Sequence, residues 1–209
     1  MLSSCETRSA KELLVEASKY EDRGNWQKAI LLLSKAIQKD SSYLPAYLNR
    51  GADESALGHY QAAIDNYSTV IRLSPANTLA LLNRGKNRNR LGDYRVALED
   101  FRRAVDSKGG ELVWIDLQPN NFVDAGYDCS MQEILLERGV AYYNLDSLNE
   151  ALRDFQFCIA KHFALGIAYR FRGFIYIASG KKDRGCTDLK KAASMGDTDA
   201  VKGIVKYCN

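Results

Sequence analysis

Apolar residues recur along most of this chain at helical spacing, in short segments that are separated by polar corners. Residues 81–105 show the pattern well. Leu81 and Gly85 share one face of a first predicted helix, Gly92 lies at the corner, and Phe101 lies on the apolar face of a second helix. Such spacing predicts pairs of antiparallel helices rather than strands.

The pattern also repeats with a fixed period. Three sets of residues recur at intervals of 34 positions: Ala29, Ala63 and Ala97; Gly24, Gly58 and Gly92; Trp26, Tyr60 and Tyr94. A period of this size is typical of a solenoid, in which each helical hairpin can bury its apolar face only against its neighbours. The sequence therefore predicts a stack of helical hairpins.

The repeated segment resembles the tetratricopeptide repeat (TPR), which has small residues at positions 8 and 20 and large ones at positions 4, 17 and 24. Five copies align, at 10–43, 44–77, 78–111, 132–165 and 166–199. Position 8 holds Ala17, Gly51, Gly85, Gly139 and Gly173, and position 20 holds Ala29, Ala63, Ala97, Ala151 and Gly185. The resemblance implies an all-α fold, a right-handed α-α superhelix of about eleven helices.

We expect one TPR domain over residues 10–199, after a flexible N-terminus at 1–9. Residues 200–209 are expected to form a capping helix, because the last hairpin of a solenoid otherwise exposes its stacking face. The cap is expected to turn four apolar residues toward the last repeat: Val201, Ile204, Val205 and Cys208.

The period breaks once, between Ala97 and Ala151, where about 20 extra residues are inserted at 112–131. The insertion carries Trp114 and Phe122 and is too apolar for simple disorder. It either folds over a groove or makes a dimer contact, or else it is a surface segment packed by its own aromatic side chains.

Four arginines recur at position 7 of successive repeats, and each has an acidic or amide residue 16 positions later. The pairs are Arg50 with Asn66, Arg84 with Asp100, Arg138 with Asp154, and Arg172 with Asp188. The constant spacing predicts contacts between the two helices of a hairpin, since a guanidinium group suits a carboxylate. The alternative is a set of four arginines for an anionic ligand.

In TPR proteins the first helices of successive repeats line a concave groove. By resemblance, the peptide-binding residues here are Leu48, Asn49, Leu82, Asn83, Lys86, Arg90, Leu136, Tyr143 and Asn144. The side-chain amides of Asn49 and Asn83 can bond the backbone of an extended peptide, or a neighbouring helix instead. Lys86 and Arg90 lie four residues apart on one helical face, where they either bind an acidic group or stay solvated.

Some TPR proteins hold a peptide carboxylate with lysine, asparagine and arginine at set groove positions. This sequence has Leu14 and Ser18 at the first pair of those positions, and Leu79 and Asn83 at the last pair. The resemblance therefore does not extend to binding of heat-shock chaperone tails.

Composition and motif content exclude several classes of protein function. The net charge is +3 over 209 residues, too small for a strongly basic nucleic-acid face, and no apolar run is long enough for a transmembrane helix. No catalytic motif, cofactor motif or metal-ligand spacing is present, so no enzyme activity, cofactor or metal is expected. The five scattered cysteines fit a reducing, cytoplasmic location. The alternative is a lipoprotein anchored through Cys5, because Leu2 to Cys5 resembles a bacterial lipobox if a signal segment precedes it.

We therefore predict a non-catalytic scaffold that binds a peptide or protein segment in its concave groove. The repeats, especially the LNRG phrases, resemble bacterial ones. The alternative is a self-associating structural or adaptor module, a homodimer formed through residues 112–131 or through an end repeat.

Overall fold

The computed structural model describes residues 8–107 and 129–208. Within these ranges the chain forms eleven α-helices and no strand, as the sequence predicts. In chain order they are α1 Ala10–Glu21, α2 Trp26–Lys39, α3 Leu44–Ala56, α4 Tyr60–Leu73, α5 Thr78–Leu91, α6 Tyr94–Asp106, α7 Met131–Asn144, α8 Leu148–Ala160, α9 Leu165–Ala178, α10 Lys182–Ser194 and α11 Thr198–Tyr207. Most of the expected 112–131 insertion lies outside the described residues, and so does Cys5.

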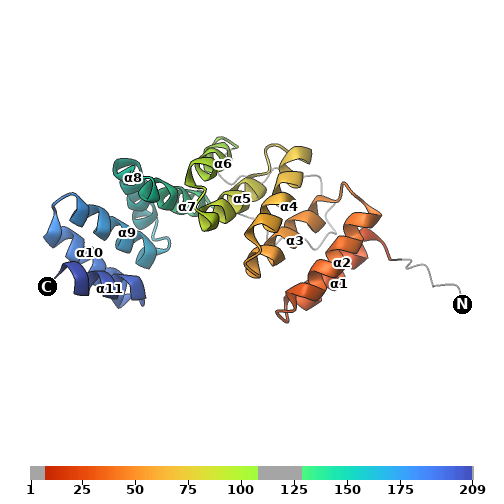
Figure 1. Ribbon diagram of the computed structural model, residues 1–209, viewed down its shortest axis with the longest axis horizontal. Helices are drawn as coiled ribbons and strands as arrows, with labels where there is room; N and C mark the ends of the chain where they lie inside the picture. The colour runs from red at the N-terminus through yellow and green to blue at the C-terminus, as the bar shows by residue number, and fades with distance from the viewer. Residues whose placement is uncertain (1–7, 108–128, 209) are drawn as a thin grey trace, which may run out of the picture.

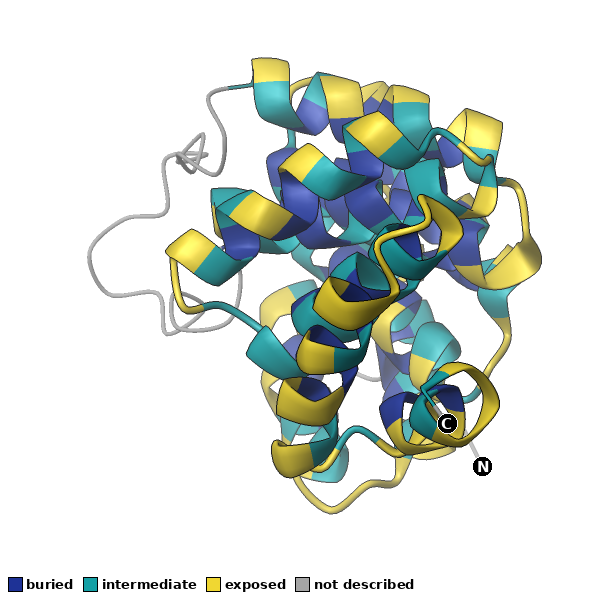
Figure 2. Ribbon diagram, turned by 90° about the vertical axis from the view of Figure 1, so that its left-hand side faces the viewer, coloured by how far each residue is buried: buried dark blue, intermediate teal, exposed yellow. Residues whose placement is uncertain are grey.

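The helices stack as consecutive hairpins along one direction. Each odd-numbered helix from α1 to α9 packs on the helix that follows it, and each hairpin packs on the next. Figure 1 shows the resulting elongated array, with α1 at one end and α11 at the other. Buried residues occupy the faces between helices, while exposed residues cover the outer surface (Figure 2). Each hairpin thus buries its apolar face against its neighbours.

The two helices of a hairpin meet through a glycine on the first and an aromatic ring on the second. A Cβ atom added to Gly51, Gly85 or Gly139 would lie 2.9, 2.6 or 3.0 Å from the ring of Tyr67, Phe101 or Phe155, respectively. These distances leave no room for a methyl group. The small residues at position 8 therefore allow the close approach that the sequence pattern predicts.

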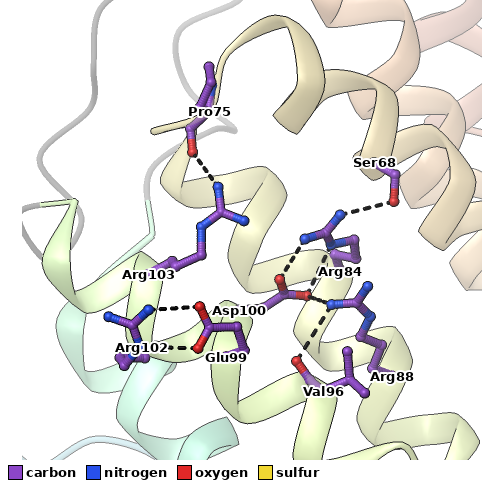
Figure 3. A network of polar contacts seen from close by, with 9 residues as sticks. All are labelled: Ser68, Pro75, Arg84, Arg88, Val96, Glu99, Asp100, Arg102 and Arg103. Carbon is purple, nitrogen blue, oxygen red and sulfur yellow. Dashed lines mark hydrogen bonds and ion pairs between the residues drawn. The ribbon is translucent and has the colours of Figure 1, made fainter.

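The predicted contacts between position 7 and position 23 are also present. Figure 3 shows the pair in the third hairpin, where Arg84 donates from Nη2 to Asp100 Oδ1 at 2.7 Å and from Nε to Oδ2 at 3.0 Å. The other three pairs are Arg50 with Asn66 at 2.8 Å, Arg138 with Asp154 at 2.7 and 2.8 Å, and Arg172 with Asp188 at 2.7 and 3.0 Å. These arginines tie together the two helices of the second to fifth hairpins.

Asp100 has a second partner that the other repeats do not supply. Arg88, one turn after Arg84 on α5, donates from Nη1 to Asp100 Oδ2 at 2.6 Å. Arg84 also reaches the preceding hairpin, where its Nη1 donates to Ser68 Oγ at 3.1 Å. Two guanidinium groups therefore depend on one buried carboxylate at the centre of the array.

The capping helix differs from its prediction in two ways. It begins earlier, at Thr198, where the Asp197 side chain accepts from the backbone N–H of Ala200. It also turns Val201 and Val205 outward, with 50% and 66% of their surface exposed. Ile204 and Cys208 do pack against the last repeat as predicted. Beside them the inward face carries the small residues Ala200 and Gly203, because the ring of Phe174 lies close against Gly203 and leaves no space for a larger side chain.

Two of the five cysteines are paired, although scattered cysteines are typical of a reducing location. Cys186 on α10 and Cys208 after α11 form a disulfide, with their Cα atoms 5.7 Å apart. Cys129 and Cys158 are both buried. The bridge fastens the end of the capping helix to the last hairpin.

Candidate functional site

The first helices of the hairpins line the inside of the curve. Successive first helices contact one another, from α1 with α3 through to α7 with α9. Successive second helices, such as α2 with α4, make no such contact among the described residues. Because the first helices converge and the second helices diverge, the concave face is formed by α1, α3, α5, α7 and α9.

Three of the four joints between these first helices are closed by a contact of one type, from position 12 of one repeat to position 6 of the next. At the α1–α3 joint, Asn49 Nδ2 lies 3.5 Å from Glu21 Oε1. At the α5–α7 joint, Asn89 Nδ2 donates to Glu137, at 2.9 Å to the carbonyl oxygen and 3.4 Å to the carboxylate. At the α7–α9 joint, the rings of Tyr143 and Phe171 meet edge to face at 5.0 Å.

The joint between α3 and α5 is different. The two corresponding residues are Ser55, whose side chain is short, and Asn83, whose side chain is hydrogen-bonded to the Tyr67 hydroxyl on α4. Ala52 and Ala56 beside Ser55 are exposed. The centre of the concave face is therefore lined by small side chains at α3, where the other joints carry larger contacts.

The charged residues predicted for the groove, Lys86 and Arg90, both lie on α5. Lys86 Nζ donates to Glu133 Oε1 on α7 at 3.0 Å, which spans the α5–α7 joint. Arg90 is exposed, and no hydrogen bond or ion pair joins it to another described residue. The structure thus leaves one cation of the predicted pair available and engages the other.

The remaining predicted residues fall into two groups. Leu48, Leu82 and Leu136 are buried in the hydrophobic clusters between helices, so they offer little surface to a ligand. Tyr143 is half-buried against Phe171, and Asn144 is exposed with its Nδ2 donating to the carbonyl of Val140 at 2.8 Å.

A buried carboxyl group on α3 was not among the predicted residues. Asp53 on α3 is only 2% exposed, and its Oδ2 atom has no hydrogen-bond partner among the described residues. Burial raises the pKa of Asp53 to about 8, and the nearby carboxylates of Glu21 and Glu54 add to the shift. Burial also raises the pKa of Glu21, against the effect of its contact with Asn49.

The sequence does carry a signal for this residue. Asp53 holds position 10 of its repeat, and Asn87 holds the same position in the next, where its Oδ1 is also buried without a partner. The later repeats place buried Ala141 and Ile175 at that position. The fold therefore accepts apolar residues there, and a polar residue at position 10 is not needed for packing.

The described residues contain no metal cluster, since no group of three or more His, Cys, Asp or Glu side chains is placed to hold an ion. Among the helices that the structure describes, none is both long enough and apolar enough to cross a bilayer.

No protein-family model matches this sequence, and no curated protein matches it either. Solved structures do match. Residues 41 to the end of MamA from Desulfovibrio magneticus RS-1 align with a TM-score of 0.72 at 15% identity, over 90% of this chain and 94% of that one. YrrB, a TPR protein with an unusual peptide-binding site, aligns with a TM-score of 0.69 at 21% identity, over 94% and 92%. PilW, a type IV pilus biogenesis factor, aligns with a TM-score of 0.70 at 15% identity, over 88% and 76%.

These similarities define the fold. The chain is a helical solenoid of the tetratricopeptide repeat type, as its 34-residue period predicts. At these identities the comparisons do not extend to a ligand, which has to be argued from the residues of this chain.

Proposed function

We propose that this protein is a non-catalytic scaffold that binds a peptide or protein segment along the concave face of α1, α3, α5, α7 and α9. The proposal rests on the side chains that line the joint between α3 and α5, at the centre of this face. There, exposed Ala52 and Ala56 on α3 line a joint without a closing side-chain contact, and exposed Arg90 lies on α5, the next helix of the concave face. The likeness in fold to YrrB, whose peptide-binding site is known, supports the same use of the fold here.

The binding mechanism is a preformed surface that meets an extended segment. Because the helices are held by buried contacts, ordering cost falls mainly on the ligand. Arg90 supplies an unpaired guanidinium group for an acidic side chain, and a carboxylate accepts two parallel bonds from such a group. Asn49, Asn83 and Asn144 lie along the same row of helices, and a peptide backbone that bonds them would compete with their contacts to Glu21, Tyr67 and Val140.

The test uses peptides selected from a random 12-residue display library against the full chain. Each selected peptide is then titrated by fluorescence anisotropy against wild type and against two charge reversals. Arg90→Glu on the concave face is expected to weaken binding about tenfold or more, because it replaces attraction by repulsion. Arg95→Glu, an exposed arginine on the second helix of the same hairpin, is the matched control and is expected to change little. Equal affinities for the two variants would place the peptide elsewhere and contradict the proposal.

A second candidate is self-association through an end of the array. The observation that favours it is the exposure of Val201 and Val205 on α11, the capping helix. Replacing both valines by lysine would lower the mass in solution if this face joins two copies. Deletion of residues 112–131 tests the alternative contact, and those residues lie almost entirely outside the described ranges. An unchanged mass in both variants would rule out both dimer contacts.

The redox state of the Cys186–Cys208 pair in the cell tests in which compartment the protein resides. The predicted cytoplasmic location requires this pair to be reduced in the cell, whereas an anchored lipoprotein outside the cytoplasm keeps it oxidised. Trapping free thiols with an alkylating reagent as the cells are lysed distinguishes the two.

A further inference from the structure

The positive charge of this chain is concentrated at its C-terminal end. Residues 161–209 contain ten lysines and arginines and four aspartates, so their formal net charge is +6, whereas that of the whole chain is +3. The preceding 160 residues therefore have a net negative charge. Figure 1 places α10 and α11 at one end of the array, and Figure 2 views the molecule from that end.

Burial makes this asymmetry stronger at the surface. Of the ten cationic side chains only Arg170 and Arg172 are not exposed, and each forms an ion pair with an aspartate that is itself shielded from solvent. Of the four carboxylates only Asp183 and Asp199 are exposed, and Asp199 accepts from Lys202 at 2.9 Å. The exposed cations are Lys161, Lys181, Lys182, Arg184, Lys190, Lys191, Lys202 and Lys206.

Three of these lysines gather around the disulfide that joins the last two helices. Lys182 and Lys190 lie one turn before and one turn after Cys186, on the same side of α10. Lys206 lies two residues before Cys208. Because the bridge holds the Cα atoms of the two cysteines 5.7 Å apart, ammonium groups from two helices share one end of the array.

The same end exposes apolar side chains. Val201 and Val205 lie one turn apart on α11, and a lysine follows each of them, Lys202 and Lys206. Tyr207 is also exposed, at the end of the helix. Apolar and cationic groups on one exposed helix face are typical of helices that lie in the interface of a bilayer, where lysines meet lipid phosphates and apolar groups reach the acyl boundary.

Charge decides among the partners that such a surface could take. A symmetric contact with a second copy joins the same face of both chains, which brings Lys202 and Lys206 against the lysines of the other copy. A nucleic acid offers phosphates to the lysines but no apolar layer to the valines. A bilayer with anionic lipids supplies both.

We propose that the exposed face of α11, with the lysines around the Cys186–Cys208 bridge, docks on the surface of a membrane that contains anionic lipids. Val201 and Val205 then reach the boundary between headgroups and acyl chains. This inference goes beyond segment binding and does not depend on it. Among the described helices α11 contacts only α9 and α10, so docking of α11 leaves α3 and α5 open to a segment.

The experiment sediments the full chain, with its bridge oxidised, together with lipid vesicles. One set contains phosphatidylcholine alone, and the other contains equal parts of phosphatidylcholine and phosphatidylglycerol. Wild type should bind only the anionic set, and added salt should weaken the binding. Each lysine near an anionic surface strengthens binding about fivefold, so Lys190→Glu with Lys206→Glu should weaken it by at least about twentyfold. Arg72→Glu with Arg95→Glu makes the same change of charge on exposed positions of α4 and α6, and should bind as wild type does.

A second pair of substitutions tests the apolar contact. Val201→Asn with Val205→Asn keeps the charge and should weaken binding to anionic vesicles about tenfold, because two exposed valines no longer leave water. All six replaced residues are exposed, so the three double variants should keep the wild-type melting temperature.

Failure of wild type to bind anionic vesicles, or an equal loss in the two charge-reversed pairs, would overturn the proposal. Unchanged binding in the asparagine pair, together with equally tight binding of a DNA duplex, would overturn it in favour of a general polyanion site. A dimeric mass of wild type without lipid that becomes monomeric in the asparagine pair would overturn it in favour of a second copy.

Discussion

Asp100 is the carboxylate on which the middle of the solenoid depends most. It accepts three hydrogen bonds from two guanidinium groups, at 3.0 and 2.7 Å from Arg84 and at 2.6 Å from Arg88. The arginine side chains are only 12% and 18% exposed. Asp100→Asn keeps the shape but removes the charge and one acceptor, which leaves one of the two arginines without its partner.

The free-energy cost of Asp100→Asn can be bounded by comparison with the equivalent pairs in the other hairpins. Removing one member of a buried ion pair costs about 3–5 kcal/mol, and an asparagine that keeps one acceptor retains part of the contact. The second hairpin has an asparagine at this position, and it keeps one such hydrogen bond, since Asn66 Oδ1 accepts from Arg50 Nε at 2.8 Å. We therefore expect Asp100→Asn to destabilise by about 2–3 kcal/mol, and Asp188→Asn, which has a single arginine partner, by about 1–2 kcal/mol.

Unfolding in urea followed by circular dichroism measures the total change, and hydrogen exchange of the α5 and α6 amides measures it locally, because repeat arrays can unfold in steps. Arg88→Met in the Asp100→Asn background is expected to recover about 1 kcal/mol, because it removes the unpaired charge. The reasoning would be refuted if Asp100→Asn cost no more than Asp188→Asn, or if Arg88→Met were equally harmful in both backgrounds.

Three further outcomes are expected. Gly85→Ala should destabilise by about 1–3 kcal/mol because its methyl group meets a ring at 2.6 Å, whereas Gly166→Ala, with no atom nearer than 3.7 Å, should not; thermal melts compare them. Loss of the bridge in Cys186→Ser should destabilise the C-terminal end of the array by about 3 kcal/mol. Limited proteolysis should then cleave α11 faster than in wild type, and an unchanged rate of cleavage would contradict this. Because the folded-state pKa of Asp53 is raised to about 8 from an ordinary 3.8, the folded state holds the extra proton between these values. Stability should therefore fall as pH rises from 5 to 8, and urea midpoints for Asp53→Asn should show a smaller slope.

The hairpins and their internal arginine contacts could be predicted from sequence because both depend on constant offsets. In the second to fifth hairpins the arginine at position 7 meets the residue 16 positions later, so the pattern itself contains the contact. The close approach at Gly85 follows in the same way from small and large residues at fixed positions.

The joints of the concave face could not be predicted in this way. Their contacts also follow a constant offset, from position 12 to position 6 of the next repeat, but the residues differ at every joint. A carboxylate with an amide, an amide with a carboxylate, and two rings share no sequence signature. The contact that closes each joint can therefore be recognised only from the positions of the helices and not from the residue types.

The C-terminal end shows a second reason for failure. The outward rotation of Val201 and Val205 follows from the small residues Ala200 and Gly203, which allow α11 to approach Phe174. The positions of the largest apolar residues do not predict which face of a helix packs inward when small residues on another face allow a closer approach to the neighbouring helix. The Cys186–Cys208 bridge has no spacing motif, although Cys208 lies on the face that was predicted to meet the last repeat.

The most direct test of the central claim is hydrogen exchange of the whole chain with and without a saturating peptide selected from the library. The account predicts added protection on the first helices, greatest in α3 and α5 around the central joint, and little change in α4 or α6. Protection concentrated on α11 or on the second helices would contradict it, because the segment would then lie outside the concave face.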